Sequence, residues 1–169
     1  MRAIQICAVP ILLALLCPAR AADAPRACDA PQHRQFDFWI GDWDVRTPDG
    51  RRAGTNRVTG IANGCGLQEH WTGARGTLGT SLNTYDAARG LWHQTWVDSS
   101  GTVLLLDGSF RDGRMILGGA TRSSRGASTT DRITWEPLRG GDVRQLWEQS
   151  ADGGASWSVV FDGRYSRRR

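Results

Sequence analysis

The chain of 169 residues contains no lysine, and it has only three histidines and four cysteines. All of its basic residues are arginines, which are scattered along the sequence apart from a run at 167–169. A nucleic-acid-binding surface needs basic residues clustered on one face. The distribution therefore argues against a nucleic-acid partner, and we expect residues 167–169 to form a solvated basic tail.

Common catalytic and metal-binding patterns are also missing. No pair of cysteines or histidines has the spacing of zinc ligands, and no Gly-x-Ser-x-Gly nucleophile elbow occurs. These patterns therefore assign no catalytic residue, no metal ligand and no bound cofactor.

The first 21 residues are typical of a secretory signal peptide. Arg2 provides a positive n-region, residues 4–17 are apolar and uncharged, and Ala19-Arg20-Ala21 fits a small-x-small cleavage site. The apolar stretch is shorter than the ~20 residues of a membrane-spanning helix. We expect a periplasmic or secreted protein with no membrane attachment after cleavage. Residues 22–35 would then form an N-terminal segment and residues 36–166 the folded domain.

Two cysteines, Cys28 and Cys65, remain after the leader. In an oxidising compartment two cysteines most often pair. Such a disulfide would close a loop of roughly 40 residues and hold the N-terminal segment against the rest of the fold. Two buried free thiols are the alternative.

Ten short segments with strand-like patterning follow one another between turns rich in glycine and aspartate. Period-2 alternation and tight hairpin chemistry predict an all-β meander. Closing it as an antiparallel up-and-down barrel removes unpaired edges. A short helix is expected over 32–38 and a Gly/Ser-rich loop over 118–128. The expected strands are 39–45, 54–61, 67–72, 80–85, 91–98, 103–110, 115–117, 131–138, 143–149 and 157–166.

A motif in the first segment, Gly41-Asp42-Trp43, resembles the Gly-x-Trp of lipocalins and other calycin barrels. In those families the tryptophan plugs one barrel end and packs on a basic residue of the last strand, a role for which the resemblance suggests Arg164. The string 36–45, with Glu69-His70-Trp71 and residues 92–98 and 145–149, is similar to a family of exported bacterial lipocalin-like proteins of unknown function. The resemblance implies a calycin-type barrel and no established activity. Haem-binding calycin relatives use a histidine near the end of the chain, and none follows His93 here.

A second motif covers residues 150–157, Ser-Ala-Asp-Gly-Gly-Ala-Ser-Trp. It resembles the Asp-box of sialidase propellers, a structural hairpin in which the aspartate accepts hydrogen bonds from turn amides. A single copy in a chain of this length predicts a turn between the last two strands rather than a sialidase.

Residues two apart on a strand share a face, and several aromatic rows arise in this way. We expect those rows to point inward, including the row of Val159, Phe161 and Tyr165, while His70 and His93 point outward. Three of the rows also carry Glu69, Gln94 or Gln145. A buried polar group without a partner is costly, so these three side chains must bond one another, hold water or face a ligand.

Three functions fit this pattern. The first is a binding protein for a small, partly apolar molecule, which would contact Glu69, Trp71, Trp92, Gln94, Trp96, Trp135, Gln145 and Trp147. The second is an enzyme using the same cavity, with Glu69 as general base and His70 or Arg132 nearby. The third is a structural or interaction module whose aromatic side chains fill the barrel completely.

Overall fold

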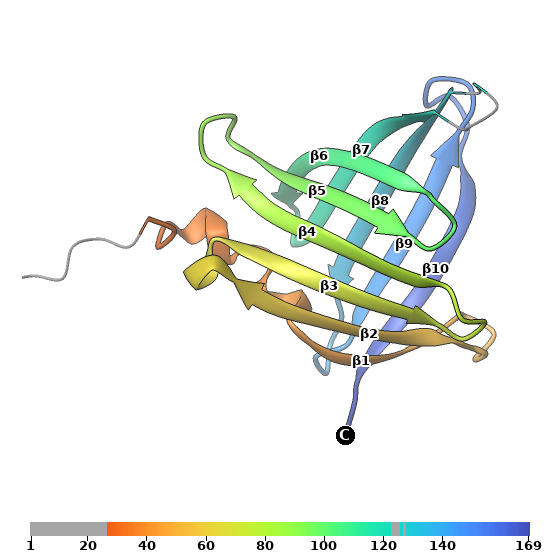
Figure 1. Ribbon diagram of the computed structural model, residues 1–169, viewed down its shortest axis with the longest axis horizontal. Coiled ribbons are helices and arrows are strands. Elements are labelled where there is room, and N and C mark those ends of the chain that lie inside the picture. Colours follow the sequence, from red (N-terminus) through yellow and green to blue (C-terminus); the bar gives the residue numbers. More distant parts are fainter. Residues whose placement is uncertain (1–26, 123–125, 127) are drawn as a thin grey trace, which may run out of the picture.

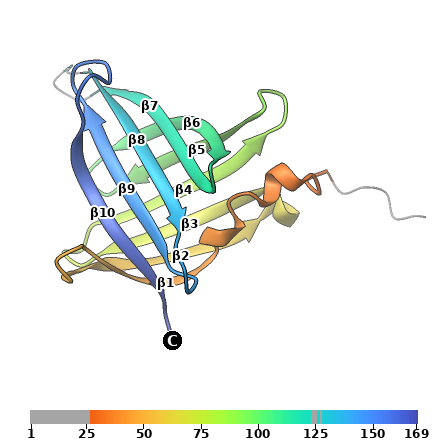
Figure 2. The ribbon, with the colours of Figure 1, turned by 180° about the vertical axis from the view of Figure 1, so that it is seen from behind.

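The computed structural model describes residues 27–122, 126 and 128–169, so the expected leader at 1–21 lies outside the described residues. Ten antiparallel strands close into one barrel, in which each strand pairs with its neighbours in sequence and β1 pairs with β10 (Figures 1 and 2). This confirms the predicted all-β, up-and-down barrel. The strands are β1 (Gly41–Arg46), β2 (Arg52–Ile61), β3 (Gly66–Gly73), β4 (Leu78–Asp86), β5 (Leu91–Asp98), β6 (Val103–Arg111), β7 (Arg114–Arg122), β8 (Ser128–Pro137), β9 (Val143–Ser150) and β10 (Ser158–Arg167).

Short 3-10 helices occur where one helix was expected over 32–38. They are η1 (Pro31–Arg34) and η2 (Asp37–Trp39), and a third, η3 (Ala62–Gly64), connects β2 to β3. Phe36 lies between η1 and η2 with φ −106° and ψ 3°, outside helical geometry. This break lets the Phe36 side chain become fully buried.

Strand β7 is longer than predicted. The expected loop at 118–128 is wrong over 118–122, which continue β7 and pair with β8, and at 128, where β8 begins. In this part of β7, a β-carbon on Gly119 would collide with the carbonyl oxygen of Leu105 on β6. Glycine in a strand often marks such a close approach between backbones.

One end of the barrel is closed by the N-terminal segment, which lies across it (Figures 1 and 2). Phe36 stacks on Trp39 with a centroid distance of 5.0 Å, and it contacts Trp92 and Trp135 edge to face. Trp92 also donates a hydrogen bond from Nε1 to Gln35 Oε1 at 3.2 Å. The aromatic contacts make this end a solid core.

Trp43 of the Gly-x-Trp motif packs on a basic residue of the last strand, but that residue is Arg167. The Arg167 guanidinium carbon lies 4.2 Å from the ring centroid of Trp43, and Nη1 donates to the carbonyl oxygen of Ile40 at 2.8 Å. The expectation for Arg164 is wrong because it points outward and pairs with Asp142 at 2.7 Å. Arg167 also ends β10, so the expected solvated tail begins one residue too early.

The predicted inward rows are correct on most strands, with one exception on β10. Val159 is 62% exposed, whereas Phe161 and Tyr165 face inward. The pairing of β10 with β9 shifts between Val159 and Phe161. An extra residue in one strand reverses the side-chain alternation beyond it. Residues two apart on β10 therefore do not all share the inward face.

The predicted disulfide between Cys28 and Cys65 is present. It joins the N-terminal segment to the residue that precedes β3, with a Cα–Cα distance of 5.1 Å. Arg34 also donates a hydrogen bond to the carbonyl oxygen of Gly64. The segment that closes the barrel is therefore fixed to the barrel wall.

Candidate ligand-binding site

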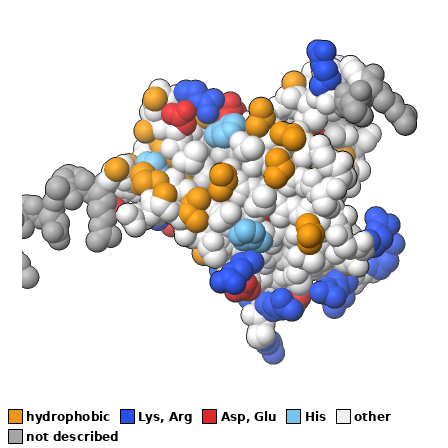
Figure 3. Space-filling model, in the orientation of Figure 1, with side chains coloured by type: hydrophobic (Ala, Val, Ile, Leu, Met, Phe, Trp, Pro, Cys, Tyr) orange, Lys and Arg blue, Asp and Glu red, His pale blue; other side chains and the backbone are white. Residues whose placement is uncertain are grey.

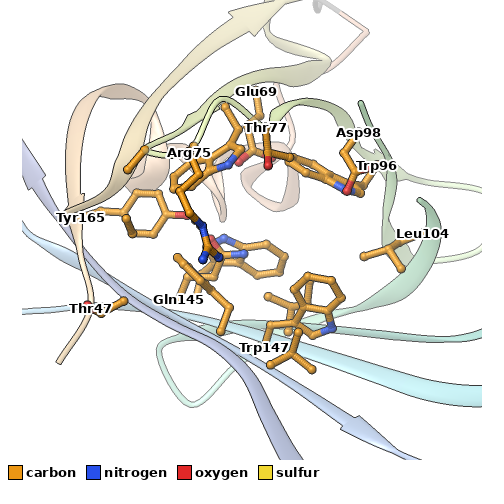
Figure 4. A pocket seen from close by; sticks show the side chains of 18 of the residues that line it. Thr47, Glu69, Arg75, Thr77, Trp96, Asp98, Leu104, Gln145, Trp147 and Tyr165 are labelled. Carbon is orange, nitrogen blue, oxygen red and sulfur yellow. Dashed lines mark hydrogen bonds between the residues drawn. The ribbon is translucent and has the colours of Figure 1, made fainter. Parts of the chain in front are cut away.

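A cavity of about 550 Å³ lies in the half of the barrel away from the N-terminal segment. Its floor contains Trp135 and Tyr165, which also belong to the aromatic core. Its mouth lies at the β1–β2 and β3–β4 turns and the end of β5, which contribute Thr47, Thr77 and Asp98 respectively (Figure 4). This volume falls within the ~300–1,000 Å³ of small-molecule pockets.

Aromatic side chains form most of the apolar wall. Trp71, Trp96, Trp147 and Phe161 line the cavity and are only partly buried. The rings of Trp71 and Phe161 meet edge to face with a centroid distance of 6.0 Å. Flat aromatic surfaces of this kind can contact an apolar or aromatic ligand over a large area.

Three glycines leave room for these rings beside the wall. A β-carbon on Gly54 would come within 2.8 Å of the Trp71 ring, and one on Gly163 within 2.5 Å of the Phe161 ring. A β-carbon on Gly79 would overlap the ring of Trp96. Glycine weakens a strand because it packs nothing and loses more entropy on folding. Here each glycine lets a ring lie against the wall instead of across the cavity.

A chain of buried polar side chains runs along the inner faces of β2 to β5. Gln94 donates to Asn83 Oδ1 at 2.7 Å, and Asn83 donates to Ser81 Oγ at 2.9 Å. Ser81 then donates to Glu69 Oε2 at 2.7 Å, while Asn56 donates to Glu69 Oε1 at 2.9 Å. Every donor in this network is directed toward the carboxyl group of Glu69, which is the final acceptor.

Glu69 is 4% exposed and lines the cavity. Burial raises its pKa to about 7, against the opposing effect of the bonds from Ser81 and Asn56. Burial, with a smaller contribution from Glu69, also raises the pKa of Tyr165 well above its ordinary value. Tyr165 therefore stays protonated, and it donates a hydrogen bond to Gln145 Oε1.

A second buried acid, Asp131 on β8, lies on the same inward face of the strand as Ile133 and Trp135. It is fully buried and accepts hydrogen bonds from Trp147 Nε1 at 2.6 Å and Gln149 Nε2 at 2.9 Å. The bond to Trp147 fixes the orientation of a ring that lines the cavity. Asp131 Oδ2 has no partner within the part of the chain that the structure describes.

Seven of the eight predicted ligand-binding residues line the cavity: Glu69, Trp71, Gln94, Trp96, Trp135, Gln145 and Trp147. The eighth, Trp92, is not among the lining residues and packs in the closed end against Phe36. His70 and Arg132, which the enzyme hypothesis placed near Glu69, are also not among them. Arg132 instead pairs with Glu148 at 2.9 Å.

Sequence reasoning missed the polar partners of Glu69, because β4 has an inverted pattern. Ser81 and Asn83 face inward and are 1% exposed, whereas Leu78 and Leu82 are more than half exposed. Figure 3 shows apolar side chains on this outer face of the barrel. Alternation along β4 places Ser81 and Asn83 on one face and Leu78 and Leu82 on the other. A rule that turns apolar residues inward would have put the leucines inside the barrel, which is the reverse of what the structure shows.

Three arginines at the mouth were also missed. Arg51 and Arg52 come from the β1–β2 turn and the start of β2, and Arg75 comes from the β3–β4 turn. In Figure 4 the guanidinium of Arg75 points into the cavity, on the side of Tyr165 and Gln145. Turn arginines carry no periodicity signal, so only the closure of the barrel reveals that they gather here.

Among residues 27–122, 126 and 128–169, no cluster of three or more histidine, cysteine or acidic side chains could hold a metal ion. Within the same residues, no helix has the length and apolarity needed to cross a membrane. No protein-family model matches the chain, and no curated protein matches its sequence.

Proposed function

We propose that this chain is an exported, calycin-like binding protein that holds a small, partly apolar molecule inside its barrel. The observation that carries the proposal is the arrangement of Gly54, Gly79 and Gly163 beside aromatic rings that line a cavity of about 550 Å³. A barrel serving only as a scaffold gains stability when its interior is filled. Strand glycines that keep the interior open lower stability, and a ligand gives a reason for them.

The polar groups of the cavity support the same proposal. Glu69, Gln94 and Gln145 lie among aromatic walls, as expected for a site that fixes the orientation of a mostly apolar ligand. The leader-like residues 1–21 and the disulfide between Cys28 and Cys65 support export. The Trp43–Arg167 contact supports the calycin-like assignment.

Native mass spectrometry of the protein purified from the periplasm of an expressing bacterium tests the proposal. We expect a co-purified organic molecule, lost on denaturation, and a higher Tm for the loaded protein than for the stripped one. Binding raises the free energy of unfolding by RT ln(1 + [L]/Kd), where [L] is the concentration of free ligand. A protein that carries no small molecule and gains no stability from a library of apolar and amphipathic compounds would contradict it.

An enzyme acting in the same cavity is the second candidate. The observation that favours it is the pKa of Glu69, about 7, beside Tyr165 as a second titratable group. Both oxygens of Glu69 already accept hydrogen bonds from protein donors, and Tyr165 donates to Gln145. These bonds favour a fixed polar floor over a free general base. Chemical conversion of the co-purified molecule by the parent, and not by Glu69→Gln, would favour the enzyme.

A further inference from the structure

The mouth of the cavity brings arginines from two neighbouring turns together. Arg52 begins β2, and Arg75 lies in the turn that follows β3, the strand paired with β2. The amide of Ala74 donates to the carbonyl oxygen of Ala53 at 2.8 Å, which joins the residues next to the two arginines. In Figure 3 basic side chains occupy the side of the molecule where these turns lie.

Arg52 and Arg75 have no acidic partner among the residues that the structure describes. Neither side chain forms a hydrogen bond or ion pair with another described residue, while Arg51 pairs with Asp49 at 2.6 Å. Arginines on the outer wall are arranged differently, since several are held by acids: Arg89 by Asp86 and Asp107, Arg132 by Glu148, Arg144 by Asp162 and Arg164 by Asp142.

The two acids that line the cavity do not neutralise these arginines. Asp98 Oδ1 accepts hydrogen bonds within its own turn, from Ser100 N at 2.8 Å, Ser100 Oγ at 2.6 Å and Thr102 N at 3.1 Å. Glu69 lies deep in the cavity and is held by Asn56 and Ser81. Arg52 and Arg75 therefore line the rim of a largely apolar cavity with no ion-pair partner among the described residues, and the Arg75 guanidinium points inward (Figure 4).

We propose, on the basis of the proposed binding function, that the ligand is an amphipathic organic anion. Its anionic group lies at the mouth between Arg52 and Arg75, and its apolar body lies among Trp71, Trp96 and Trp147. Guanidinium groups bind carboxylate and sulfonate oxygens through charge-assisted, often bidentate hydrogen bonds. The opposite orientation would bring the anion to the carboxyl group of Glu69, where an ionised Glu69 repels it.

Two fluorescent probes with the same aromatic body test this inference. One is 8-anilinonaphthalene-1-sulfonate, and the other is the neutral N-phenyl-1-naphthylamine, which lacks the sulfonate. We expect the parent to bind the anionic probe more tightly. The double variant Arg52→Gln/Arg75→Gln should weaken the anionic probe about tenfold and the neutral probe less than twofold. The control Arg139→Gln, in the β8–β9 turn at the closed end, should change neither Kd.

The possible failures are distinguishable. Equal affinities of the parent for the two probes, or equal losses for both in the double variant, would overturn the anion inference and leave the binding function standing. If the parent binds neither probe but co-purifies with a small molecule, only the anion inference is overturned. If it binds neither probe, carries no small molecule and gains no stability from the compound library, the proposed binding function fails and this inference fails with it. A salt titration adds a separate readout. We expect added NaCl to weaken only the anionic probe in the parent, and to have little effect on either probe in the double variant.

Discussion

The ring of Trp96 lies over Gly79 on the adjacent strand, in the space that any β-carbon at position 79 would occupy. Trp96 is paired with Ser81, two residues further along β4, so its ring leans back along the strand to reach the glycine. The ring thus covers the backbone of the wall, and the middle of the barrel stays open. The cavity stays open because the bulky ring of Trp96 fits over Gly79, which has no side chain.

Replacing Gly79 with alanine should reduce binding. The new methyl group forces the Trp96 ring away from β4, and the open direction is into the cavity. We expect at least a fivefold rise in the Kd of N-phenyl-1-naphthylamine in a fluorescence titration, with a loss of 1–3 kcal/mol in folding free energy (an order-of-magnitude range for overpacking).

Gly60→Ala is the matched control, because Gly60 also lies in a strand and a β-carbon there meets no atom within 4 Å. This variant should bind the probe as the parent does. If both variants bind equally well, Trp96 does not limit the cavity, and the argument from the strand glycines is wrong.

Glu69 should make stability depend on pH. Its pKa is about 7 in the folded protein and 4.5 ordinarily. Well below pH 4.5 the carboxyl is neutral in both the folded and the unfolded protein, so it does not change the free energy of unfolding. As pH rises from 4.5 to 7, the unfolded state ionises first, so the folded state loses stability. Above pH 7 the loss is constant at about 3 kcal/mol.

The variant Glu69→Gln keeps the shape of the side chain and cannot ionise. The difference in unfolding free energy, variant minus parent, should therefore increase by about 3 kcal/mol from pH 4.5 to pH 8. Other titrating groups cancel in this difference. Urea titrations at four pH values measure it. A difference that is the same at every pH would show that Glu69 titrates normally in the folded protein.

The disulfide between Cys28 and Cys65 should contribute strongly to stability. It closes a loop with a sequence separation of 37 and fixes the segment that carries Phe36 and Trp39. The chain-entropy model gives about 3–4 kcal/mol for such a loop. Intact mass should rise by two hydrogen atoms on reduction, and reductant should lower the urea midpoint.

The double variant Cys28→Ser/Cys65→Ser serves as the control for the reductant. Its urea midpoint should match that of the reduced parent and should not respond to reductant. An unchanged mass of the parent on reduction would contradict the disulfide itself.

The barrel could be predicted from the sequence because its signals are local. Turn glycines such as Gly101 and Gly113 mark the hairpins, and both have positive φ. Alternation placed Trp71, Gln94 and Trp96 on the inner face correctly. The disulfide followed from the expectation that only two cysteines remain after cleavage of a leader at 1–21.

Other features depend on non-local geometry. Trp92 shares a face with Gln94, but the N-terminal segment covers one end of the barrel and removes Trp92 from the cavity. The bulge that exposes Val159 depends on the pairing of β10 with β9. The arginines at the mouth could not be located before the open end was known.

The contact between Arg167 and Trp43 gives a final prediction. The alternation of side chains along β10 already distinguishes the two possible partners of Trp43. Arg167 is two residues after the inward-facing Tyr165, whereas Arg164 is one residue before it. Pairing of β1 with β10 places Arg167 directly opposite Trp43. A β-carbon on Gly41 would overlap the Arg167 guanidinium, so the glycine of Gly-x-Trp makes room for this contact.

Arg167→Ala should lower the free energy of unfolding by about 1–2 kcal/mol, since it removes the cation–π contact and the hydrogen bond to Ile40. Arg164→Ala breaks only an exposed ion pair with Asp142 and should cost less than about 1 kcal/mol. Arg168→Ala should cost less than about 0.5 kcal/mol. Urea titrations of the three variants measure this order. Equal losses of unfolding free energy for Arg164→Ala and Arg167→Ala would mean that the contact of Arg167 with Trp43 does not stabilise this end of the barrel.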